Sequence, residues 1–150
     1  MSMSLRELAL KSKGRRRRRL SSKESKSRRR KGYDAERSLV KKLRSLGFKA
    51  VRIPSSAPSS EPLPDVFATS GNTLIALEVK ASAEDRIYFS PEQIKKLFDF
   101  LDMFSPYKKK IALLAGKFPY KWIFKRVDKI DSYVIHRDEE SEIKLEMIRE

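Results

Sequence analysis

Apolar and polar residues along this chain alternate in several short stretches, and apolar residues recur at helical spacing in two longer ones. Residues 66–69 and 73–79 are rich in β-branched and apolar side chains, and Ser70-Gly71-Asn72 between them is typical of a tight turn. These stretches predict a β-hairpin. Further strands are predicted at 48–53, 86–89, 111–115, 120–127 and 132–136.

Two helices are predicted around this hairpin. The first covers residues 33–46 and ends at Gly47, and the second follows the capping box of Ser90 and Gln93 with Pro91 in its first turn. The order is a helix, three strands, a short strand, a helix and two or three more strands. It predicts an α/β fold in which a mixed β-sheet is flanked by α-helices. The charged segment 137–150 is compatible with either a helix or an edge strand.

The hairpin register brings charged residues together. If Gly71-Asn72 is a two-residue loop, Ser70 faces Thr73 and Asp65 lies directly opposite Glu78. Side chains alternate along a strand, so Lys80 shares the face of Glu78. Two neighbouring carboxylates repel each other unless a positive charge separates them, and a hard divalent cation is a natural neutraliser.

A glutamate interrupts the apolar stripe of the first helix. Counting back three and four residues from Leu39 and Val40 gives Glu36, so a carboxylate lies on the side that should face the core. A charge there is costly unless it is paired or binds a metal. The structural alternatives are a salt bridge to Arg37 or another nearby base, and a first helical turn that is still exposed.

The composition narrows the candidate chemistry. The chain has 150 residues, 39% of them hydrophobic, with no long apolar run and no recognisable signal peptide, so one domain without a membrane span is expected. Because there is no cysteine and only one histidine, His136, a zinc site and a histidine-based nuclease are disfavoured. The Pro/Ser-rich loop at 54–64, which leads to Asp65, is long enough to suggest a function.

Most of the formal net charge of +15 lies at the N-terminus. Residues 1–32 hold 14 Lys or Arg and 2 Glu, whereas residues 33–150 hold 21 Lys or Arg and 18 Asp or Glu. The segment 1–31 has almost nothing to bury and is predicted to be a disordered basic arm. A DNA-phosphate-binding arm is favoured over a tail that only aids solubility. Its basic clusters are Arg15, Arg16, Arg17, Arg18 and Arg19, then Arg28, Arg29, Arg30 and Lys31.

An ordered set of motifs resembles a known family. The motifs are Gly32-x3-Glu36-Arg37, Arg52-x-Pro54-x-Ser56, Pro64-Asp65 and Glu78-Val79-Lys80. Together they resemble the archaeal Holliday junction resolvase family, which belongs to the PD-(D/E)xK nuclease superfamily. The resemblance covers about residues 31–127 and implies a restriction-endonuclease-like fold. A lone E-x-K is weak, whereas this ordered set is much more specific.

The resemblance implies a role for each matching residue. It implies that Glu36, Asp65 and Glu78 bind a divalent metal, usually Mg²⁺ with Mn²⁺ as a substitute, together with the main-chain carbonyl of Val79. Lys80 would orient or deprotonate the attacking water. Ser56 would contact DNA beside the site. The expected DNA contacts also include Ser55, Arg37, Arg52 and the basic clusters of the arm.

The implied function is cleavage of four-way DNA junctions by a homodimer, in the cytoplasm at the nucleoid. Two alternatives stay open: a less selective nuclease acting on flaps, nicks or duplex, and a non-catalytic DNA-binding protein that acts through the arginine-rich arm. The expected organisation is a basic arm at 1–31, a nuclease domain at 32–136 and a charged tail at 137–150.

Overall fold

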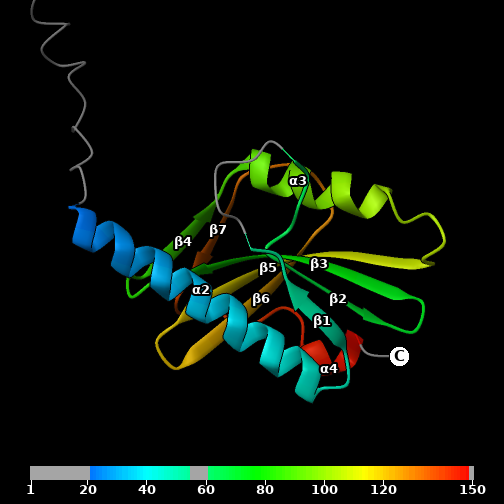
Figure 1. Ribbon diagram of the computed structural model, residues 1–150, viewed down its shortest axis with the longest axis horizontal. Helices are drawn as coiled ribbons and strands as arrows, with labels where there is room; N and C mark the ends of the chain where they lie inside the picture. The colour runs from blue at the N-terminus through cyan, green and yellow to red at the C-terminus, as the bar shows by residue number, and fades with distance from the viewer. Residues whose placement is uncertain (1–20, 55–60, 149–150) are drawn as a thin grey trace, which may run out of the picture.

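The computed structural model describes residues 21–54 and 61–148 of the chain. A five-stranded mixed sheet, in the order β1-β2-β3-β5-β6, forms its centre (Figure 1). These strands are β1 (Lys49–Arg52), β2 (Val66–Ser70), β3 (Thr73–Ala81), β5 (Lys109–Phe118) and β6 (Lys121–Val127). A separate two-stranded sheet pairs β4 (Arg86–Phe89) with β7 (Tyr133–His136). The helices in the described ranges are α2 (Ser22–Ser45), α3 (Pro91–Asp102) and α4 (Leu145–Ile148).

The predicted hairpin is confirmed, with the predicted register. Ser70 pairs with Thr73 across a two-residue loop, and Gly71 has the positive φ of 56° that such a tight loop needs. On its other edge, β3 runs parallel to β5, and the connection between them passes through β4 and α3. The predicted mixed sheet flanked by helices is therefore confirmed as well.

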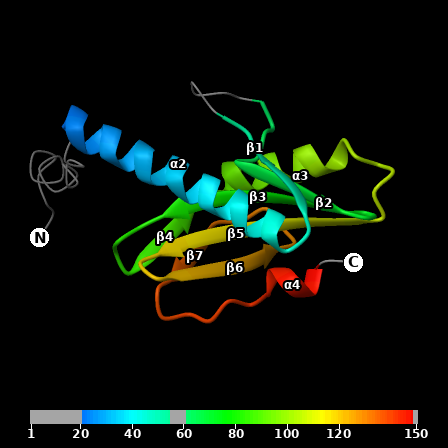
Figure 2. The same cartoon turned by 60° about the horizontal axis from the view of Figure 1, so that its bottom comes forward.

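Helices cover both faces of the central sheet (Figures 1 and 2). On one face, a single core contains Leu39 and Leu43 of α2, Leu145 of α4, and Ile75 and Leu77 of β3. The opposite face carries α3 and the small sheet, in a second core that includes the buried residues Leu74, Ala76, Ile94, Leu97 and Phe89. Strand β3 is thus buried on both faces, which is typical of a strand with a parallel neighbour.

The first helix begins earlier than predicted. Residues 22–31, expected to be disordered, form the first part of α2, and Gly32 lies inside this helix. The Ser21 hydroxyl accepts a hydrogen bond from the main-chain N–H of Glu24 (3.1 Å), and the Glu24 carboxylate accepts one from the N–H of Ser21 (3.2 Å). This capping box satisfies two N–H groups that would otherwise lack partners at the helix start.

The prediction that the first helix begins at residue 33 failed because it relied on an apolar stripe to detect the helix. The first part of α2 extends beyond the sheet (Figure 1), so it has little apolar surface to bury. Lys, Arg and Glu all have favourable helix propensity, and the helix can continue without packing once it is anchored at 35–43. The predicted boundary between arm and domain at residue 32 is therefore wrong.

The C-terminal segment is part of the same core. Leu145 and Ile148 of α4 are almost fully buried against the α2 face of the sheet. The Ser141 hydroxyl accepts a hydrogen bond from the main-chain N–H of Phe124 (2.8 Å), which ties the segment to β6. The prediction of a separate charged tail after residue 136 is corrected by these contacts.

The small sheet lies close to the middle of the central one. Gly116 of β5 pairs with Lys80 of β3, and a Cβ atom at Gly116 would lie 3.4 Å from Ile87 and 3.5 Å from Ile135. These are ordinary packing distances, so β4 and β7 pack directly over β5 at this point. Strand β4 therefore lies beside Lys80.

We predict that Gly32→Ala stabilises α2. A Cβ atom at Gly32 would have no heavy atom within 4 Å, and alanine in a helix interior is favoured over glycine by about 0.5 to 1 kcal/mol. Amide hydrogen exchange of residues 22–36 should slow. Gly47→Ala is the control and should destabilise, because Gly47 ends the helix at a φ of 94°. Unchanged exchange in Gly32→Ala would contradict a helix that continues through this position.

Candidate active site

Asp65 and Glu78 are held in place by the pairing of three strands. Asp65 directly precedes β2; its N–H donates to the carbonyl of Leu77 (3.1 Å), and its carbonyl accepts from the N–H of Ile53 (2.9 Å). Glu78 lies on β3 and is only 7% exposed. The register therefore fixes both carboxylates on adjacent strands at the edge of the α3-side core.

The two carboxylates form a coupled pair. Their side chains are hydrogen bonded to each other, and Asp65 Oδ2 also accepts a hydrogen bond from the N–H of Val79 (2.9 Å). Burial, and then repulsion by Asp65, raises the pKa of Glu78 to about 9. Burial also raises the pKa of Asp65, against the opposing effect of the Val79 hydrogen bond. The metal-free pair therefore retains a proton at neutral pH.

Lys80 lies on the same side of β3, as predicted. Its Nζ donates to the carbonyl of Tyr88 on β4 (2.5 Å) and is 5.2 Å from the centre of the Phe89 ring. Burial lowers the pKa of Lys80, while Glu78 and Asp65 partly counteract this effect. The ammonium group is thus positioned by β4, and it loses its proton more readily than an exposed lysine.

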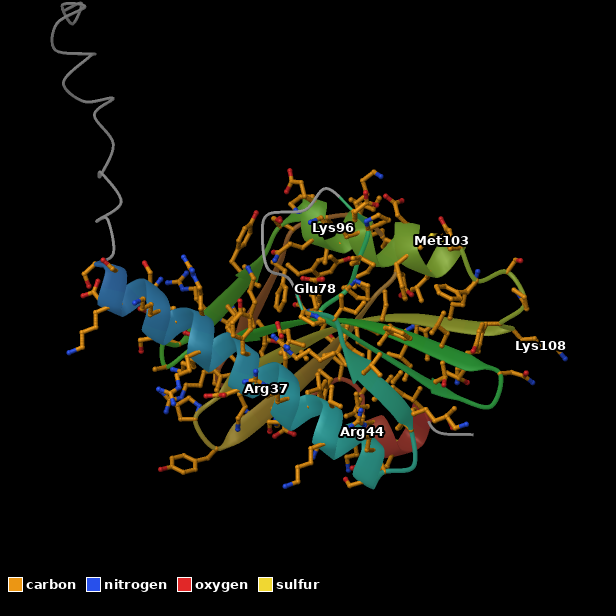
Figure 3. All side chains as sticks on the ribbon, viewed as in Figure 1. Arg37, Arg44, Glu78, Lys96, Met103 and Lys108 are labelled. Carbon is orange, nitrogen blue, oxygen red and sulfur yellow. The ribbon has the colours of Figure 1, made fainter. Side chains whose placement is uncertain are left out.

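Lys96 is a residue of this site that the sequence did not reveal. It lies on α3 and is half-buried, and its positive charge lowers the pKa of both Asp65 and Glu78. Figure 3 shows Lys96 and Glu78 near each other, between α3 and the sheet. The available signal was the pair Ile94 and Leu97, whose packing places this part of α3 over the face that carries Glu78.

Glu36 lies near the pair but has a partner of its own. Its Oε2 accepts a hydrogen bond from Arg52 Nε (2.6 Å), and the two side chains are only 12% and 18% exposed. The Arg52 guanidinium lies 4.7 Å from the centre of the Tyr33 ring. Burial raises the pKa of Glu36, Arg52 lowers it, and Asp65 raises it further, so Glu36 is within electrostatic reach of Asp65. The alternative of a pairing with a nearby base is thus realised by Arg52.

The three acidic residues do not form one cluster in this structure. Across residues 21–54 and 61–148, no three acidic or histidine side chains lie close enough together to hold a metal ion. In this structure Asp65 and Glu78 form a pair and Glu36 is held by Arg52, so a metal site shared by all three stays a prediction. The physical reason is that a buried carboxylate needs a positive partner, and Arg52 provides one for Glu36.

The pair nevertheless fits a hard divalent cation. Two buried carboxylates that retain a proton between them can together contribute more negative charge once a cation takes the place of that proton. Oxygen ligands of this kind suit Mg²⁺ or Mn²⁺. The contribution of the Val79 carbonyl stays a prediction; its side chain packs in the core on the α2 side of the sheet.

The remaining predicted DNA contacts are distributed around this site. Arg28, Arg29, Arg30 and Lys31 are exposed on α2, and Arg37 is exposed and pairs with Asp34 (3.5 Å). Arg52 is engaged with Glu36. Two groups lie outside the described residues, namely Ser55 and Ser56, and Arg15 to Arg19. His136 is exposed on β7 of the small sheet and is not part of the carboxylate pair.

None of the helices in the described residues has the length and apolar character that a membrane span needs.

The mixed sheet with helices on both faces, and the Asp65 and Glu78-x-Lys80 arrangement at its centre, define a restriction-endonuclease-like fold of the PD-(D/E)xK class. This assignment agrees with the sequence resemblance.

Comparison with known proteins identifies the family within this class. The family model described as "Archaeal holliday junction resolvase (hjc)" matches residues 27–149. The crossover junction endodeoxyribonuclease Hje of Saccharolobus solfataricus is 43% identical over 109 residues, which are 71% of this chain and 79% of that protein. Hje of Sulfolobus acidocaldarius is 50% identical over 93 residues, which are 61% of this chain and 66% of that protein.

A solved structure agrees with these sequence matches. The Holliday junction resolvase Hjc of Archaeoglobus fulgidus superposes with a TM-score of 0.60 at 30% identity, covering 71% of this chain and 88% of that one. The chain belongs to the archaeal Holliday junction resolvase family.

We predict that the metal-free protein loses stability as the pH rises. Glu78 in the unfolded chain ionises near its ordinary pKa of 4.5, and in the folded protein only near pH 9, so unfolding releases a proton between these values. The free energy of unfolding should therefore fall by a few kcal/mol from pH 5 to pH 9, measured by urea denaturation with a chelator present. Glu78→Gln should flatten this dependence.

Two neighbouring lysines of α3 provide the matched control. Lys96→Met should steepen the pH dependence, because its charge lowers the pKa of both carboxylates. Lys95→Met should leave it unchanged, because Lys95 is exposed and pairs with Asp99. Equal slopes in the wild type and Glu78→Gln would show that the pair is not coupled as described. Adding Mg²⁺ should stabilise the wild type and have little effect on Glu78→Gln.

Proposed function

We propose that this chain is a Mg²⁺-dependent endonuclease that resolves four-way DNA junctions. The observation that carries the proposal is the buried pair of Asp65 and Glu78 with Lys80 on the same side of β3. Membership of the archaeal Holliday junction resolvase family supports the junction as the substrate. We also propose that the protein acts at the nucleoid, where its DNA substrate would be found.

The carboxylate pair has a direct role in this proposal. Asp65 and Glu78 would hold the cation, and Glu36 is the third carboxylate, because its charge acts on Asp65 even while Arg52 holds it. When bound, a divalent cation such as Mg²⁺ lowers the pKa of water and stabilises negative charge on a phosphate. Glu78 must give up its proton for the cation to bind, so affinity for the cation rises with pH.

Lys80 acts on the water and on the phosphate. In hydrolysis, the water oxygen forms a bond to phosphorus while the bond to the 3′ oxygen of the strand breaks; the water loses a proton, and the departing 3′ oxygen takes up one from solvent. The lowered pKa of Lys80 makes its neutral amine available to accept this proton, and as an ammonium it offsets the charge of the phosphate. The Tyr88 carbonyl holds the Nζ atom in place for both roles.

We further propose that the enzyme works as a homodimer. A four-way junction with two-fold symmetry presents two equivalent strands, and resolution requires a cut in each. A dimer with two-fold symmetry places two equivalent sites against these strands. The cleavage of both strands within one bound complex would be the signature of this arrangement.

Substitutions at the site should separate cleavage from binding. Asp65→Asn, Glu78→Gln and Lys80→Met should each lower single-turnover cleavage of a labelled junction by about 10²-fold or more. Junction binding should be retained, because the fold and the basic helix α2 are unchanged. Lys95→Met, an exposed lysine that pairs with Asp99, is the control and should cleave normally. Full activity of Asp65→Asn would overturn the assignment of the site.

Substrate choice should distinguish a resolvase from a general nuclease. With Mg²⁺ and excess competitor DNA, we expect cleavage of a synthetic four-way junction at least about tenfold faster than cleavage of a linear duplex of matched sequence, about 1.4 kcal/mol of discrimination. A chelator should abolish both reactions. Equal rates would indicate a less selective nuclease, and binding without cleavage under any divalent metal would indicate a non-catalytic DNA-binding protein.

A further inference from the structure

A basic groove lies between the first half of α2 and the turn that follows β3. Its volume is about 300 Å³. Figures 1 and 2 show the first turns of α2 passing this turn, which connects β3 to β4. The residues that line the groove are Arg28, Lys31, Ala81, Ser82, Ala83 and Glu84.

The core-facing side of α2 explains why these two cations face the turn. Ala35 and Leu39 are buried against the sheet, and counting back four and seven residues from Ala35 gives Lys31 and Arg28. Residues at these spacings share one side of a helix. Near Ala35 and Leu39 this side of α2 buries apolar residues against the sheet. Where the helix extends beyond the sheet, the same side carries Arg28 and Lys31 instead.

The groove is preorganised. The N–H of Ser82 donates to the carbonyl of Lys117 on β5 (3.0 Å), and the Ser82 hydroxyl accepts from the N–H of Glu84 (3.0 Å). These bonds fix the turn that forms one wall. Over the ranges that the structure describes, Arg28 and Lys31 form no ion pair with a carboxylate, and the only acidic side chain lining the groove is the exposed Glu84.

The groove adjoins the candidate active site. Ala81 packs on the α2 face of β3, opposite to the face that carries Lys80. The groove approaches the site along α2 instead, where Lys31 lies five residues before Glu36, about 7.5 Å along the helix axis. Arginine and lysine are the side chains that most often bind phosphates, and the exposed Arg29 and Arg30 extend the positive potential along α2.

We propose that Arg28 and Lys31 bind the DNA backbone in the groove between α2 and the β3–β4 turn, on the α2 side of the candidate active site. The inference rests on the proposed function, because the identity of the polyanion comes from there. It divides the basic cluster of α2 into two classes: cations that face the groove and cations that face solvent. A disordered arm would make no such distinction.

A charge-matched pair of double variants tests this distinction in the full-length protein. Arg28→Ala/Lys31→Ala removes the two groove cations. Lys26→Ala/Arg30→Ala removes one lysine and one arginine from the helix line that continues to Asp34, whose side chain is 64% exposed. Alanine favours the helix, so α2 is retained in both variants, which circular dichroism would verify.

Binding to a four-way junction should differ between the two variants. With a chelator present at 0.15 M salt, we expect about tenfold weaker binding for Arg28→Ala/Lys31→Ala and less than about threefold for the control. The slope of log K against log salt should fall by about 1.8 in the groove variant, since each phosphate contact contributes about 0.9. Equal losses in the two variants would overturn the proposal.

Glu84 provides a test with the opposite sign. Glu84→Gln removes the acidic side chain that lines the groove, so junction binding should strengthen by about twofold to threefold. Weaker binding, or no change, would contradict a phosphate in the groove.

Mg²⁺-dependent cleavage by the wild type tests the proposed function separately. If the wild type cleaves the junction but the two double variants bind it equally, only the proposal of a DNA-binding groove is refuted. If the two double variants bind unequally but the wild type does not cleave under any divalent metal, only the proposed nuclease activity is refuted.

Discussion

Burying two carboxylates on adjacent strands is the constraint on which the rest of this structure depends. Asp65 and Glu78 repel each other in a core that favours the neutral form of each, so the pair retains a proton when no cation is bound. The fold tolerates this cost because the N–H of Val79 stabilises the charge on Asp65. Lys80 and Lys96 add positive charge from a strand and a helix.

The surrounding elements can be understood from this constraint. The pairing of β2 with β3 fixes the register of the carboxylates, and the parallel neighbour β5 buries β3 from its other edge. The small sheet packs over Gly116 of β5, and its Tyr88 carbonyl holds Lys80. A main-chain carbonyl of β4 thus sets the position of the Lys80 side chain on β3, and the site depends on both sheets.

Much of this arrangement was predictable because it is local. The hairpin register follows from a two-residue loop, and the cap of α3 follows from Ser90 and Gln93. The pairing of Glu36 with Arg52 was not predictable in detail, since it joins a helix to a strand 16 residues away. The same is true of Lys96, whose approach to Glu78 depends on how α3 packs on the sheet. The sequence pattern identified the chemical groups, and tertiary packing selected their partners.

The extent of α2 shows how a pattern can be read too strictly. Amphipathic periodicity detects a helix only where the helix has a surface to cover, and residues 22–31 extend past the edge of the sheet. The periodicity is nevertheless present there in another form: the line of Ala35 and Leu39 continues through Lys31 and Arg28 with charge in place of apolar surface. Where a helix face passes from a core to a groove, its residues should change from apolar to charged. Basic residues on such a continuation are therefore positioned by the fold, whereas the same residues in a disordered arm would be positioned only by the DNA.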